Sequence, residues 1–157
     1  MKLLAIMTIF LASALISQEL KIKANQFDAD EKTGVSVFQG KVNIIKGNDE
    51  LNATKVTVYT DIKHQPTKYI AEGDVSFNIE TKKGALYQGI AGKVIYMPTI
   101  KEYHFFRDVH LKQIDEKKEI IGDEVVLKTI EGKAYARGAT KEPVIMIFKM
   151  PEEKEEK

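Results

Sequence analysis

Apolar and polar residues alternate along most of the chain from Leu20 onward, and a period of two is typical of half-buried β-strands. The clearest alternating runs cover residues 41–44, 55–58, 74–79, 102–111 and 124–128. No stretch keeps the period of a helix. The pattern therefore predicts a single all-β domain.

Turn-forming residues separate these runs, so neighbouring strands are expected to be joined by short connections. They lie at Gly34, Gly47–Asp49, His64–Pro66, Lys82–Gly84, Asp115–Lys118 and Glu131–Gly132. Further apolar runs at 20–28, 35–38, 134–138 and 144–148 are expected to add strands at both ends of the series.

Two short phrases alternate along the chain and form a weak internal repeat. The first phrase occupies residues 38–42, 71–75 and 106–109, and the second occupies 53–56, 91–94 and 122–125. We expect each pair of phrases to form one hairpin-like unit, which gives at least six strands. In the third unit Asp108 stands in place of the first glycine and Glu124 in place of the lysine, so the pattern defines the register less well there.

The two ends of the chain differ from the middle. Lys2, the apolar run 3–16 and Ser17 have the order of a secretory signal peptide, and the run is shorter than the ~20 residues that cross a bilayer. We expect cleavage near residue 17, with Ala14 as a competing position. The segment 151–157 is almost wholly charged and is expected to be a flexible tail, which leaves 18–150 as the domain.

Composition narrows the classes of function. Hydrophobic residues make up 43% of the 157 residues, enough for a buried core. The net charge of +1 provides no overall field to attract nucleic acid. The absence of cysteine excludes disulfides, thiolate metal sites, cysteine nucleophiles and a lipid-anchored N-terminal cysteine.

The residue types that usually carry catalysis are not arranged in any recognisable catalytic motif. His64 lies in a predicted turn, while His104 and His110 share one face of a predicted strand without the spacing of metal ligands. The carboxylates are dispersed, and no phosphate-binding glycine phrase is present. We therefore predict a binding protein, not an enzyme, with no cofactor and no metal. Alternation alone does not distinguish a ligand-binding face from the filled core of a β-sandwich.

The repeated phrases resemble those of the LptA/OstA family of lipopolysaccharide transport proteins. The resemblance rests on Phe38–Ile44 and Leu51–Val58 and recurs more loosely at 73–77 and 92–96. It implies a twisted β-jellyroll of antiparallel strands, open along one side, whose interior holds the acyl chains of lipopolysaccharide or lipooligosaccharide. It also implies a periplasmic bridge that associates end to end and joins an inner-membrane LptC-type protein to an outer-membrane LptD-type translocon.

The resemblance assigns lipid binding to the inward-facing apolar residues, called here the predicted lipid-binding set. The set consists of Val42, Ile44, Val56, Val58, Val75, Phe77, Ile79, Val94, Tyr96, Phe105, Val109, Leu111, Val125 and Leu127. Three alternatives remain at this point: a membrane-anchored LptC-type component, a structural β-sandwich that binds no lipid, and an exported enzyme with an unfamiliar site.

Overall fold

The computed structural model describes residues 19–152 and contains ten β-strands, so the all-β prediction is confirmed. The strands are β1 (Leu20–Lys23), β2 (Gln26–Asp30), β3 (Val35–Lys46), β4 (Asp49–Thr60), β5 (Pro66–Glu80), β6 (Leu86–Met97), β7 (Glu102–Gln113), β8 (Lys118–Lys128), β9 (Lys133–Arg137) and β10 (Ile145–Phe148). Within residues 19–152 no helix has the length and apolar character needed to cross a membrane. The predicted signal peptide and most of the charged tail lie outside the described residues.

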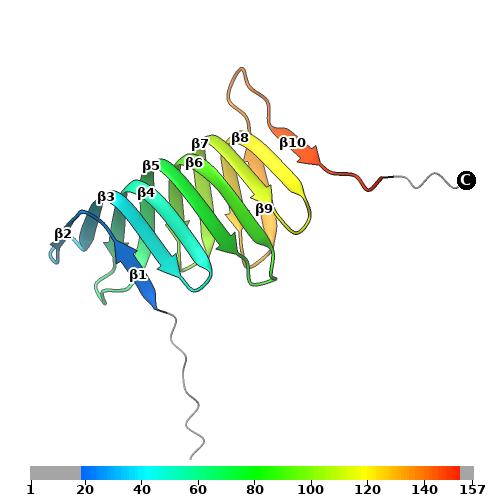
Figure 1. Cartoon of the computed structure of the whole chain (residues 1–157). Helices are drawn as coiled ribbons and strands as arrows, with labels where there is room; N and C mark the ends of the chain where they lie inside the picture. Colours follow the sequence, from blue (N-terminus) through cyan, green and yellow to red (C-terminus); the bar gives the residue numbers. More distant parts are fainter. Residues whose placement is uncertain (1–18, 153–157) are drawn as a thin grey trace, which may run out of the picture.

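All ten strands belong to one antiparallel sheet in which the long strands β3 to β8 pair in chain order. Figure 1 shows these strands side by side, with β1 and β2 at one end of the stack and β9 and β10 at the other. Successive long strands form the hairpins β3–β4, β5–β6 and β7–β8, which confirms the three repeat units. A turn at 98–101, between β6 and β7, was not predicted.

Each long strand bends near its middle and contributes to two half-sheets that enclose the core. The first half-sheet contains β2, residues 35–39, 55–60, 66–72, 93–97, 102–106 and 124–128, and β9. The second contains β1, residues 42–46, 49–53, 75–80, 86–91, 109–113 and 118–122, and β10.

The first repeated phrase marks the bend of the odd-numbered long strands. In β3, β5 and β7 two successive residues have a positive φ angle: Gly40 and Lys41, Gly73 and Asp74, and Arg107 and Asp108. One residue of the hairpin partner stands opposite each pair, so the ladder contains a β-bulge there. Because a bulge bends its strand and increases the twist, three aligned bulges fold the whole sheet along one line.

The second repeated phrase marks the same bend on the even-numbered strands. Ala53 and Val56 are both buried, and so are Ala91 and Val94, although residues this far apart on a regular strand face opposite sides. The alternation therefore changes phase once in β4 and once in β6. The two phrases alternate along the sequence because they are the two sides of one line of bulges.

The structure corrects the third unit by one position. Arg107, with φ of 65°, occupies the place that glycine has in the first two units, and Asp108 follows it. The register of β7 and β8 shifts between Phe106 and Val109, in the same way as the registers of the other two hairpins shift at their bulges. A left-handed conformation costs a non-glycine residue about 1–2 kcal/mol, so the neighbouring strands must stabilise this bulge.

The predicted run 20–28 divides into two strands that follow the bend of β3. β1 pairs with the second half of β3, and β2 pairs with the first half. Between them the Asn25 N–H donates to the carbonyl of Gly40 at 2.9 Å. The runs 134–138 and 144–148 correspond to β9 and β10, which extend different half-sheets.

The core lies between the half-sheets. Twelve of the fourteen members of the predicted lipid-binding set are buried there, and Ile44 and Tyr96 are half-buried. Val56, Val75, Phe105, Val109, Val125 and Leu127 have 0% of their surface exposed. Alternation thus identified the inward-facing residues correctly, but many of these residues pack against one another in the core.

Replacement of Gly73 by alanine tests the role of the bulge in the fold. A Cβ at this position would lie 2.6 Å from Thr54 Oγ1, on a backbone with φ of 82°. We expect Gly73→Ala to lower the free energy of unfolding by about 2–3 kcal/mol, measured by urea denaturation.

Gly84→Ala is the matched control, because Gly84 has the same φ of 82° and no atom within 4 Å of the added Cβ. We expect a loss of only about 1 kcal/mol there. Equal losses in the two variants would contradict a specific role for the close approach of Gly73 to Thr54.

Candidate functional site

The interior between the half-sheets is open along the side where the β3–β4, β4–β5 and β6–β7 turns lie. A cavity of about 330 Å³, called here the N-terminal cavity, extends from Leu20 in β1 to Tyr103 in β7. Ile44 and Tyr96, the two half-buried members of the predicted set, line it together with the fully packed Ile79. The most accessible part of the predicted set therefore surrounds an existing cavity.

An aromatic row connects this cavity to the packed core. The Tyr96 ring stacks on Tyr103 with centroids 4.3 Å apart, Tyr69 lies 6.0 Å from Tyr96, and Phe105 lies 6.0 Å from Tyr103. Phe105 in turn stacks at 4.5 Å on Phe77 of the opposite half-sheet. Burial raises the pKa of Tyr103 strongly, so its hydroxyl stays neutral within the aromatic row.

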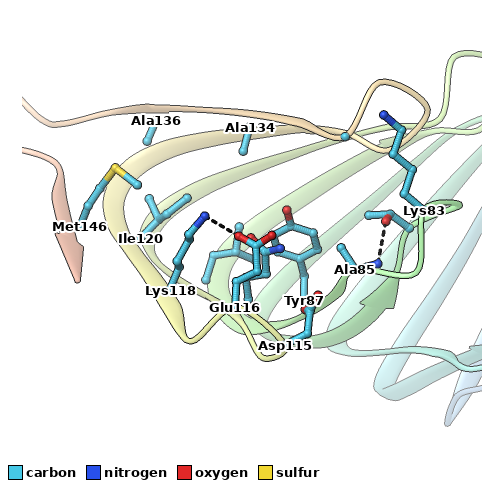
Figure 2. Close-up of a pocket in the computed structure, with 14 residues that line it drawn as sticks. Lys83, Ala85, Tyr87, Asp115, Glu116, Lys118, Ile120, Ala134, Ala136 and Met146 are labelled. Carbon is cyan, nitrogen blue, oxygen red and sulfur yellow. Dashed lines mark hydrogen bonds and ion pairs between the residues drawn. The ribbon is translucent and has the colours of Figure 1, made fainter. Parts of the chain in front are cut away.

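A second cavity, of about 530 Å³, lies nearer the other end of the stack, between β5 and β10, and is called the C-terminal cavity. Figure 2 shows Ala134 and Ala136 of β9 above it, with Ile120 of β8 and Met146 of β10 at one side. Its rim is polar, since Glu116 forms an ion pair with Lys118 there (Figure 2). This cavity combines an apolar interior with a charged rim.

Polar side chains separate the two cavities along the open side of the sheet. A central cavity of about 370 Å³ shares Tyr96 and Tyr103 with the N-terminal cavity and Thr81 with the C-terminal one. The Lys83 ammonium donates to the carbonyl of Glu131 at 3.4 Å and so joins the β5–β6 turn to the β8–β9 turn. The interior is thus accessible through two cavities along its open side, and the Lys83 contact lies at the C-terminal one.

Several cavity residues were absent from the predicted set. Leu51, Tyr69 and Tyr103 line the N-terminal cavity, and Met146 lines the C-terminal one. Tyr103 belongs to an alternating run and Leu51 to a repeated segment, so the sequence pattern could have identified both as inward-facing. The position of Met146 depends on the pairing of β10 with β8, which the sequence does not specify.

The histidines lie away from these cavities. The His104 ring contacts Glu102 at 3.2 Å and the His110 ring contacts Glu119 at 2.7 Å, both in half-buried positions. The hydrogen bond from His110 holds the pKa of the Glu119 carboxyl below its ordinary value. Among residues 19–152 no group of three or more histidine and carboxylate side chains is arranged to hold a metal ion.

Both ends of the stack present strand edges. In the described sheet β1 and β2 pair only with β3, and β9 and β10 pair only with β8. All four residues of β10, Ile145 to Phe148, are apolar, with between 42% and 52% of their surface exposed. The ends therefore carry backbone groups and apolar side chains that can pair with another strand.

Comparison with known proteins agrees with this geometry. A crystal structure of LptH, described as the LptA homologous periplasmic component of the conserved lipopolysaccharide transport device from Pseudomonas aeruginosa, superposes with a TM-score of 0.75 at 18% sequence identity. The match covers 85% of this chain and 96% of LptH, which confirms the predicted jellyroll fold. By sequence alone no curated protein matches this chain.

The sequence model of one family matches most of the strands, from β1 to the start of β9. It covers residues 21–133 and describes the LptA/(LptD N-terminal domain) LPS transport proteins. The match includes all three repeat units and the residues that line the N-terminal cavity from Ile44 to Tyr103. This chain therefore belongs to the LptA/LptD N-terminal domain family of lipopolysaccharide transport proteins.

Proposed function

We propose that this protein carries lipopolysaccharide through the periplasm and shields the acyl chains between its two half-sheets. The single observation that carries the proposal is the pair of cavities that lie towards opposite ends of the open side of one interior. Removing an acyl chain from water contributes about 0.8 kcal/mol per methylene, so even partial enclosure of several chains is strongly favourable. Family membership supports the same cargo.

The predicted lipid-binding set divides into two groups under this proposal. Ile44 and Tyr96 line the N-terminal cavity and contact lipid without rearrangement. The buried residues in the middle, such as Phe77 and Phe105, contact lipid only when the half-sheets move apart. A structural sandwich that binds no lipid would explain the packed middle, but it gives no reason for the two cavities that lie on either side of it.

The two strand edges support a bridging role. A partner strand added beside β1 or β2 would extend the sheet at one end, and a strand beside β9 or β10 would extend it at the other. Such pairing keeps the interiors of neighbouring molecules in line. An inner-membrane LptC-type protein, further copies of this chain and an outer-membrane LptD-type translocon are the partners we propose.

Export precedes this function, and we propose that residues 1–17 direct it and are then removed. The membrane-anchored LptC-type alternative differs only in retaining this segment, which lies outside the described residues. The cavities and strand edges described above would be used in the same way by the exported form and by the membrane-anchored form. No catalytic role is proposed, since the family consists of transport proteins.

Photocrosslinking tests the lipid path. With a benzophenone side chain at Tyr96, which faces the N-terminal cavity, we expect a covalent adduct with lipopolysaccharide in cells that export it. The adduct is detected as a band that reacts with antibodies to both molecules.

Ile90 is the matched control, because it lies on the same strand, is 55% exposed and faces outward. We expect no adduct there. Comparable capture at both positions, or none at Tyr96 and Ile44, would favour the structural sandwich.

Lysine substitutions on β10 test end-to-end association. Charged side chains on an edge strand oppose pairing with another chain, so we expect Ile145→Lys/Ile147→Lys to weaken self-association about tenfold or more. Sedimentation velocity over a range of concentrations measures the effect.

The control variant Ile62→Lys/Ile100→Lys adds the same charge in two turns, where these residues are 96% and 49% exposed. It should associate like the unaltered protein. Association that is equally weak in both variants would indicate a general charge effect, and unaltered protein that stays monomeric at every concentration would contradict the end-to-end arrangement.

A further inference from the structure

Three lysines converge on the central cavity from both sides of its opening. Lys101 comes from the β6–β7 turn of the first half-sheet, whereas Lys46 ends β3 and Lys82 lies in the β5–β6 turn, both on the second half-sheet. These segments are distant in sequence and meet only because the strands bend. The opening is therefore cationic where the two half-sheets approach each other.

These lysines have no acidic partner in residues 19–152, where every ion pair involves other basic residues. The ammonium group of Lys82 lies near that of Lys101, and this neighbouring like charge lowers the pKa of Lys101. Lys46 adds a smaller effect in the same direction. A bound anion would relieve this repulsion.

Two carboxylates line the same cavity, and both are bonded within the second half-sheet. Asp49 Oδ1 accepts a hydrogen bond from the Glu80 N–H at 2.8 Å, and Glu80 Oε2 accepts one from the Asn48 amide at 3.1 Å. Burial raises the pKa of the Asp49 carboxyl, and the nearby Lys46 ammonium acts in the opposite direction. The carboxylates thus do not neutralise the lysines through direct contact.

The position of the lysines relates them to the lipid path. The central cavity shares Tyr96 and Tyr103 with the apolar N-terminal cavity. A molecule with an apolar tail in one cavity would place its polar head in the other. A phosphate monoester carries a charge of about −1.5 to −2 and three acceptor oxygens, which suits three converging ammonium groups.

We propose that Lys46, Lys82 and Lys101 form a phosphate subsite for an amphiphile whose acyl chains occupy the N-terminal cavity. This inference rests on the proposed function and adds to it a site for the charged head group. The lysines select phosphorylated lipid, and the apolar cavity supplies affinity for the chains.

The test compares the binding of two lipids by the unaltered purified protein and by three variants. The probes are bisphosphorylated lipid A and the same acylated disaccharide without phosphates, and the variant is Lys82→Met/Lys101→Met. We expect this variant to bind bisphosphorylated lipid A about tenfold more weakly than the unaltered protein and the dephosphorylated probe equally well. Unchanged binding of the second probe also shows that the variant is folded.

The control variant Lys32→Met/Lys63→Met removes the same charge from exposed turns outside the three cavities. It should bind both probes normally, while Lys82→Arg/Lys101→Arg should retain affinity for the phosphorylated probe. Equal losses in the two methionine variants, or equal binding of both probes by all proteins, would overturn the subsite and leave the lipid groove intact. Failure of the unaltered protein to bind either probe would overturn the proposed function as well.

Discussion

The architecture depends on a pair of left-handed residues in the middle of each odd-numbered long strand. Gly40 and Gly73 adopt this conformation readily, and the bulge they initiate bends strands of twelve to fifteen residues so that one strand serves both half-sheets. Without the bend the same strands would form a flat sheet with one face exposed. The enclosed interior, its two openings and the meeting of distant turns all follow from this backbone constraint.

Much of this fold could be predicted from the sequence, because alternation reports which side of a strand is buried. Val42, Val75 and Val109 each follow a bulge and are buried, as the repeat indicated. The bulge itself was not predicted. A single sequence shows the spacing of Gly40 and Val42 but not the φ angles between them. In the third unit the same spacing before Val109 already indicates Arg107, so the assignment of Asp108 to the glycine position was a misreading of the repeat and not a limit of the sequence.

The apolar character of the site could be predicted from the sequence, but the residues that line its cavities could not. Inward residues were identified, yet alternation does not tell a packed residue such as Phe105 from a cavity residue such as Ile44, because both face the same side. The alternating pattern also gives no information about which turns meet across the opening between the half-sheets. Lys82 and Lys101 lie in separate turns, and their proximity depends on the angle between the half-sheets.

Transport through this protein depends on lipid binding between the half-sheets, which methyl NMR of isoleucine side chains can detect. Ile44 lines the N-terminal cavity, Ile120 lines the C-terminal cavity, and Ile90 faces outward on β6. On titration with lipopolysaccharide, we expect the Ile44 and Ile120 methyl signals to shift while that of Ile90 stays in place. Shifts confined to Ile90 and other outward-facing methyl groups would contradict binding between the half-sheets.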